Sequence, residues 1–118
     1  MDNDGMVMRS FCVDRDIDDA VLLHAKRLRG QNGATFRLFL ETGLTSFKAG
    51  RKLPARVEGT QVLRMCYWDF SVAEKVRGLA FSEGIPESEL ISRVARLGMA
   101  KVGELTHPQS DRARSTRR

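Results

Sequence analysis

Two cysteines and two histidines are the side chains of this chain best suited to chemistry. Cys12 and Cys66 stand neither in a CxxC pair nor near a histidine at metal-ligand spacing, which is typical of reduced packing residues. His24 falls on the apolar side of a helical pattern, where a packed histidine is commoner than a catalytic base, and His107 lies in a polar segment. None of the four has a partner nearby in the sequence that would make it a nucleophile or a base.

Three aspartates, Asp16, Asp18 and Asp19, could hold a cation, but they fall in the first turn of a predicted helix. There the helix dipole stabilises negative charge without any metal. No glycine-rich phosphate loop follows a predicted strand. We therefore expect no enzymatic activity, no metal, no cofactor and no small-molecule substrate.

Basic residues exceed acidic ones, with 20 Lys and Arg against 15 Asp and Glu and a formal net charge of +5. The excess is concentrated in two segments rather than spread along the chain. The basic residues of these segments are Lys48, Arg51, Lys52 and Arg56, and then Arg112, Arg114, Arg117 and Arg118. Such clusters favour a polyanionic partner, and double-stranded DNA is the one we expect.

The overall composition is that of one ordinary domain, with 118 residues of which 42% are hydrophobic and 30% charged. No apolar run approaches the roughly 18 residues that a membrane helix needs. The first residues, MDNDG, lack the basic start and apolar stretch of a signal peptide. We expect a cytoplasmic protein without a membrane partner.

The chain repeats itself when it is shifted by 55 residues. This shift aligns six identical pairs, namely Val7 with Val62, Arg9 with Arg64, Asp14 with Asp69, Val21 with Val76, Ala25 with Ala80 and Gly43 with Gly98. The apolar residues also recur at helical period in corresponding places of the two halves. Each half is therefore predicted to be a strand, a helix, a short turn and a second helix.

The predicted units span residues 6–47 and 62–103, separated by a basic linker at 48–61 and followed by a disordered basic tail at 104–118. One such unit would leave a lone strand and an open apolar helix face. Two units remove both problems if their strands pair antiparallel over four interlocked helices. The predicted fold is mainly α with a two-stranded antiparallel ribbon, and the two units form one compact domain.

The stretch "VAEKVRGLAFSEGIPESELISRVARLGM" resembles the helix pair of the ribbon-helix-helix family of DNA-binding proteins, with Gly84 at the turn and Gly98 near the end. The first unit is less typical, because Gly33 and Ala34 stand where the second unit has Ser88 and Glu89. The resemblance covers residues 6 to about 103 and implies a ribbon that lies in the DNA major groove. Family members are usually homodimers, so a tandem chain implies a monomer that forms an intramolecular pseudo-dimer.

The tandem form is similar to members of the family that assist plasmid and T-DNA processing and transfer in virulence and conjugation. This similarity implies an accessory factor of that kind, with proteins of a DNA-transfer complex as further partners. Two alternatives stay open. One is a ribbon-helix-helix transcriptional repressor or antitoxin-like regulator, and the other is a protein-interaction module that uses an apolar ribbon face.

Strand alternation predicts which ribbon side chains face DNA. The outward set is Met8, Ser10, Cys12, Leu63, Met65 and Tyr67. It is more apolar than the polar triplets usual in the family, so we expect modest sequence specificity. Arg9 and Arg64 stand at equivalent positions near the outer ends of the strands, where each could reach a phosphate or form a surface salt bridge.

Further contacts are expected outside the ribbon. The family typically binds a phosphate at the start of the second helix, which corresponds to Asn32, Gly33, Ala34 and Thr35 in the first unit and to Ser88 in the second. Pro86 and Glu87 make the second site weaker, because proline lacks an N–H and glutamate is negative. The linker residues Lys48, Arg51, Lys52 and Arg56 are predicted to add attraction to DNA that does not depend on sequence.

Overall fold

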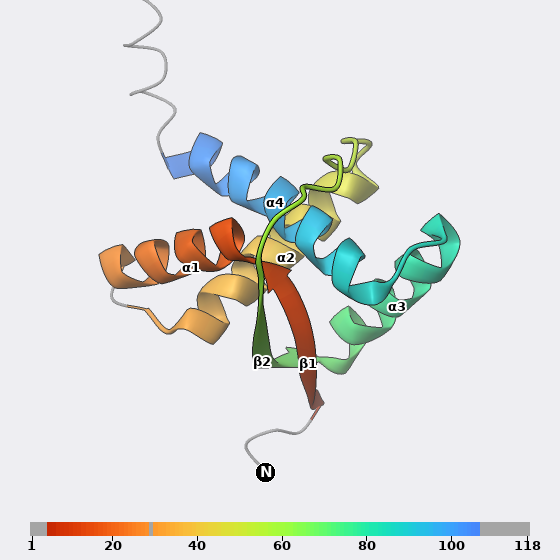
Figure 1. Ribbon diagram of the computed structural model, residues 1–118, viewed down its shortest axis with the longest axis horizontal. Coiled ribbons are helices and arrows are strands. Elements are labelled where there is room, and N and C mark those ends of the chain that lie inside the picture. The colour runs from red at the N-terminus through yellow and green to blue at the C-terminus, as the bar shows by residue number, and fades with distance from the viewer. Residues whose placement is uncertain (1–4, 29, 107–118) are drawn as a thin grey trace, which may run out of the picture.

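The computed structural model describes residues 5–28 and 30–106 and consists of four helices and a two-stranded antiparallel sheet (Figure 1). This confirms the predicted mainly α class with an antiparallel ribbon. In chain order the elements are β1 (Met6–Asp14), α1 (Arg15–Leu28), α2 (Asn32–Lys48), β2 (Gln61–Asp69), α3 (Phe70–Glu83) and α4 (Glu87–Thr106).

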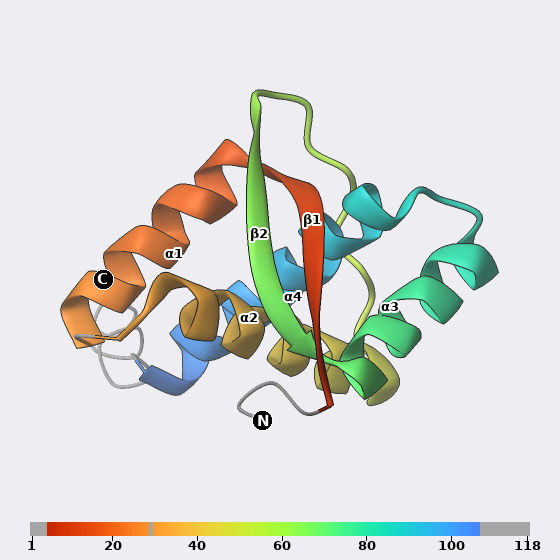
Figure 2. The same ribbon diagram turned by 90° about the horizontal axis from the view of Figure 1, so that it is seen from below.

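The ribbon lies across one face of the molecule with the helices behind it (Figure 2). Its register pairs Val7 with Trp68, Ser10 with Met65 and Val13 with Val62. On the helix side Val13 and Trp68 are among the most buried side chains of the core, and Phe11 and Cys66 are buried too. Burial of these apolar side chains on one face sets the register, since a one-residue slip would turn all of them to solvent.

The centre of the core is the crossing of α2 and α4, where glycine allows the two backbones to touch. A Cβ added at Gly43 would lie 2.0 Å from the carbonyl oxygen of Val94. A Cβ added at Gly98 would lie 1.7 Å from the carbonyl oxygen of Phe39. Only a residue without a side chain fits at either position.

Several contacts between the two halves occur in exchanged pairs under the shift of 55 residues. The amide of Arg15 donates to the carbonyl of Thr60 at 2.9 Å, and that of Phe70 donates to the carbonyl of Gly5 at 2.7 Å. Residues 15 and 70 correspond under the shift, as do residues 5 and 60. The glycine contacts of α2 and α4 are exchanged in the same way.

The element boundaries differ from prediction at the linker and at the predicted tail. Lys48 ends α2 and Gln61 begins β2, so the segment without regular structure is 49–60. Arg93 of α4 donates through Nε to the carbonyl of Pro54 at 2.8 Å, which holds this segment against α4. The prediction that 104–106 belong to a disordered tail is wrong, because α4 continues to Thr106. Extending a helix that has already formed is easier than starting a new one, so these residues can continue α4. Residues 107–118 lie outside the described part.

Within the described residues, no helix combines the length and the apolar character that crossing a membrane requires.

Candidate nucleic-acid interface

The outward face of the ribbon carries the six side chains predicted for it. Met8, Ser10 and Tyr67 are exposed, and Cys12 is half-buried. Leu63 and Met65 are each 66% exposed, which is unusual for large apolar side chains on a sheet that also has a buried face. The predicted inward and outward alternation is confirmed, and the outward surface is largely apolar.

Arg9 and Arg64 belong to the helix-facing register and form ion pairs there. The Nη2 atom of Arg9 lies 2.8 Å from Oε1 of Glu87. Arg64 donates through Nε and Nη2 to the two carboxylate oxygens of Asp18 at 2.8 and 2.7 Å, and this hydrogen bonding raises the pKa of Arg64. The salt bridge that the sequence left open is therefore present at both positions, and contact of these arginines with DNA stays a prediction.

The start of α2 is open to an anion. Gln31 precedes the helix in an extended conformation without a side-chain cap, and the first turn contains no acidic residue. The amide and the hydroxyl of Thr35 both donate to the carbonyl of Gln31, each at 3.0 Å. Both donors of Thr35 are thus committed, whereas the amides of Asn32, Gly33 and Ala34 precede the first helical hydrogen bond and point out of the helix end.

The start of α4 differs in charge and in hydrogen bonding. Its first turn contains Glu87 and Glu89. The hydroxyl of Ser88 accepts a hydrogen bond from the amide of Cys12 at 3.4 Å, and that of Ser92 accepts one from the amide of Asp14 at 3.3 Å. Ser88, predicted as a phosphate contact, therefore covers the outer edge of β1, and this helix start suits an anion less well than the start of α2.

Arg37 is a candidate contact that the sequence reasoning missed. Its Nη1 donates to the carbonyl of Tyr67 at 3.0 Å and lies near Gly33, where an added Cβ would be 4.0 Å away. No carboxylate pairs with Arg37 in the part of the chain that the structure describes. The signal in the sequence was its position four residues after Gly33, which puts Arg37 on the same helix face as Gly33, one turn from the helix start.

Arg37 also lies close to the buried thiol of Cys66. Burial raises the pKa of Cys66, and the positive charge of Arg37 together with its hydrogen bond offsets part of that rise. The thiol of Cys66 approaches the carbonyl of Gly33 at 3.6 Å, so it joins β2 to the start of α2. Cys66 is thus the packing residue that the sequence predicted, while Cys12 lies on the outward face.

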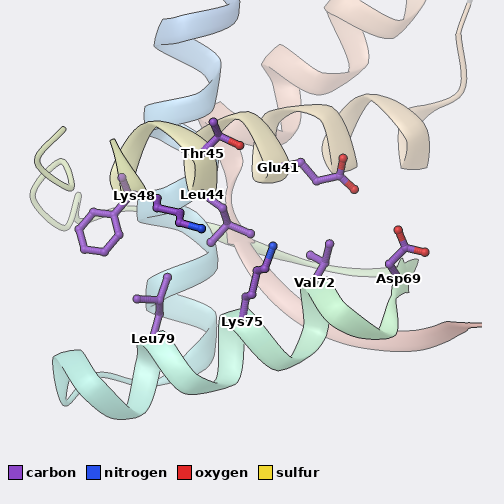
Figure 3. A pocket seen from close by; sticks show the side chains of 9 residues that line it. Glu41, Leu44, Thr45, Lys48, Asp69, Val72, Lys75 and Leu79 are labelled. Atoms are coloured by element: carbon purple, nitrogen blue, oxygen red, sulfur yellow. The ribbon is translucent and has the colours of Figure 1, made fainter. Parts of the chain in front are cut away.

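The predicted linker cations differ in their surroundings. Lys48 lines a groove between α2 and α3 that none of the six outward ribbon side chains lines (Figure 3). Arg56 pairs with Glu58 at 3.0 Å. Arg51 and Lys52 are exposed directly after α2. The ribbon and the α2 start thus adjoin through Arg37 and Cys66, whereas Lys48 lies in a separate groove.

Asp16 and His24 each contact another side chain of the protein. Arg96 donates to Asp16, and this hydrogen bond lowers the pKa of the Asp16 carboxyl. His24 packs against Phe39 with ring centroids 5.5 Å apart. Among the described residues no three His, Cys, Asp or Glu side chains are grouped as metal ligands would be.

Comparison of the chain with models of protein families, with curated proteins and with solved structures found no match.

Proposed function

We propose that this chain is a DNA-binding protein that places its two-stranded ribbon in the major groove. The observation that carries the proposal is the ribbon itself, which is exposed on one face with six side chains directed away from the core. A two-stranded antiparallel ribbon has the right width for the major groove of B-form DNA. Its helix-facing side is packed, so the outward side is free to meet a partner.

The outward side chains would read bases mainly by apolar contact. Ser10 and Tyr67 can exchange hydrogen bonds with base edges, whereas Met8, Leu63 and Met65 can pack on thymine methyl groups. Few hydrogen bonds to bases mean modest discrimination between sequences, because a good bidentate pair is worth about 1–3 kcal/mol of discrimination.

Phosphate contacts would hold the ribbon in the groove. The free amides of Asn32, Gly33 and Ala34, reinforced by Arg37, favour an anion at the α2 start. The α4 start, with Glu87 and Pro86, favours it less. Unequal halves suit a target site without two-fold symmetry, since a covalently joined chain need not present identical surfaces.

We further propose that the chain is an intramolecular pseudo-dimer of two strand-helix-helix units. The exchanged contacts of Arg15 with Thr60 and of Phe70 with Gly5 support this proposal, as do those of Gly43 and Gly98. The resemblance to tandem ribbon-helix-helix proteins supports an accessory role in plasmid or T-DNA processing and transfer. A repressor or antitoxin-like regulator is the alternative within the same DNA-binding class.

A salt titration of DNA binding tests the proposed function. Binding of the full chain to a mixed set of labelled duplexes should be measurable by fluorescence anisotropy at about 50 mM salt, and the logarithm of the affinity should fall linearly with the logarithm of the salt concentration. A slope corresponding to a few released counterions is expected. If no complex forms, or if the affinity does not change with the salt concentration, DNA is not the ligand of this face.

A protein-interaction module is the second candidate, favoured by the exposure of Leu63 and Met65. In that case the ribbon face would dock on an apolar surface of another protein. Replacing both residues by Ser distinguishes the two candidates. If the ribbon enters DNA, the double variant should change the preference among duplex sequences but keep the salt slope, which depends on phosphate contacts.

A further inference from the structure

A groove of about 640 Å³ opens between α2 and α3; none of the six outward ribbon side chains lines it, but Lys48 of the predicted linker contacts does. Its floor is apolar and includes Leu44, Val72 and Leu79. Two carboxylates, of Glu41 and Asp69, stand at one end (Figure 3). The volume is in the range of sites that hold small molecules or a short peptide segment.

At the corresponding place in the other half of the molecule, an ion pair bridges the two elements. Under the shift of 55 residues, Glu41 corresponds to Arg96 and Asp69 corresponds to Asp14. Arg96 of α4 lies 2.8 Å from Asp14 and 2.6 Å from Asp16, and its side chain is only 19% exposed. One guanidinium therefore joins α4 to the end of β1 and the start of α1.

In the open half, the same place contains two like charges. Figure 3 shows the carboxylates of Glu41 and Asp69 turned toward each other across the groove. Neither has an ion-pair partner among the described residues, and two facing carboxylates repel each other. At the position where Arg96 joins α4 to β1 in one half, the other half therefore has the anion Glu41.

Lysines line the middle of the groove. The ammonium groups of Lys48 and Lys75 reach over the apolar floor in Figure 3, and neither is part of an ion pair within the described residues. They can donate hydrogen bonds to the carbonyl or carboxylate oxygens of a bound molecule. The lining thus suits a molecule that has a cation near Glu41 and Asp69, acceptor oxygens near the two lysines and apolar groups on the groove floor.

We propose that this groove binds a segment of a partner protein in which an arginine is flanked by apolar side chains. The guanidinium lies between Glu41 and Asp69, and it meets Asp69 as Arg96 meets Asp14 in the other half. Arginine is favoured over lysine, because its planar fork can donate to two carboxylates at once. The apolar neighbours cover Leu44, Val72 and Leu79, and backbone carbonyls of the segment accept from Lys48 and Lys75.

The groove is separate from the outward side chains that are proposed to enter the major groove. None of the outward ribbon side chains Met8, Ser10, Cys12, Leu63, Met65 and Tyr67 lines the groove. Asp69, which ends β2, is the one lining residue that belongs to the ribbon.

A peptide titration of the full, isotope-labelled chain tests the proposal by NMR. The probe is the blocked tripeptide acetyl-Leu-Arg-Leu-amide, and the control probe contains citrulline, which keeps the shape of arginine without its charge. The arginine probe should shift the amide signals of Glu41, Asp69 and Val72 and saturate at about 1 mM. Shifts of equal size with citrulline, or no saturable shift up to about 10 mM, would overturn the proposal.

Two substitutions of Glu41 sharpen the test. Glu41→Arg restores the cation found in the other half, so it should pair with Asp69, raise the thermal midpoint and abolish probe binding. Glu41→Gln removes the charge without closing the groove. It should weaken binding of the arginine probe at least threefold and change the thermal midpoint of unfolding little. A lower midpoint for Glu41→Arg than for Glu41→Gln would show that the two halves are not equivalent here and would overturn the proposal.

Other occupants would give different results in the same experiment. If removal of residues 107–118 shifts the groove signals and tightens probe binding, the arginine-rich end of this chain is the occupant instead of a partner. If the groove signals shift with protein concentration alone, the occupant is a second copy. Either result overturns the choice of a partner segment, and unchanged groove signals in both controls support it.

Discussion

Arginine side chains near the ribbon differ in whether a carboxylate already binds them. Arg64 holds Asp18, whose side chain is 10% exposed, through two hydrogen bonds. Arg37 donates to a backbone carbonyl and has no carboxylate partner among the described residues. A guanidinium already paired with a carboxylate must give up that partner to meet a phosphate, so Arg37 is better placed than Arg64 to bind DNA.

We predict that Arg37→Gln weakens DNA binding about three- to tenfold for all sequences and lowers the salt slope by about one, since one phosphate contact is lost. The measurement is the salt titration of duplex binding. Lys26→Gln, which removes an exposed cation from α1, is the matched control for loss of net charge. An equal loss with Lys26→Gln would mean that Arg37 makes no specific phosphate contact.

For Arg64→Gln the predicted effect is on stability. Asp18 would be left almost buried without its partner, which costs about 1–3 kcal/mol in the free energy of unfolding. Denaturant unfolding measures this change, and Asp18→Asn in the same chain should recover part of it. A large loss of DNA affinity with unchanged stability would instead make Arg64 a phosphate contact, as the sequence first suggested.

At the scale of elements, the crossing of α2 and α4 holds the two halves together. Both helices contain a glycine at the crossing, and each glycine touches the backbone of the other helix. The strands alone could not provide this stability, because an isolated two-stranded ribbon is at best marginally stable in water. The position of the ribbon therefore depends on a close contact beneath it.

Gly43→Ala and Gly98→Ala should each destabilise the protein by about 3 kcal/mol or more, because the new methyl group would overlap a backbone carbonyl that cannot move alone. Thermal or denaturant unfolding measures the loss. Gly78→Ala on the exposed side of α3 is the matched control, since an added Cβ there meets nothing within 4 Å. This control should stabilise by about 0.8–1 kcal/mol through helix propensity, and similar effects at all three glycines would contradict the close crossing.

At the scale of the whole molecule, each strand of the ribbon has side-chain partners at its outer edge within the same chain. Hydroxyl groups of Ser88 and Ser92 bind amides along β1, and Arg37 binds a carbonyl of β2. Side chains bound at an edge hinder the pairing of a further strand there. A second chain is thus not needed to complete the sheet or the core.

We therefore predict a monomer. Sedimentation equilibrium over about 10–100 μM protein should give the mass of one chain at every concentration, because the surface that a homodimeric ribbon would supply in trans is supplied in cis. An obligate dimer would contradict the proposed pseudo-dimer, while a weak dimer that dissociates on dilution would point to the apolar ribbon face or to the groove.

The sequence alone determined the order of elements, the antiparallel ribbon and the direction of its side chains. The elements and the side-chain direction follow from local periodicity, as with Phe11, Val13, Cys66 and Trp68, which alternate with the outward residues. The antiparallel pairing follows from the repeat of the unit, which leaves each strand one partner. Only the tertiary structure decided which residues of other elements contact these side chains. The pairing of Arg64 with Asp18, the place of Arg37 and the unequal grooves at Glu41 and Arg96 join residues from different elements, and no local pattern encodes such distances.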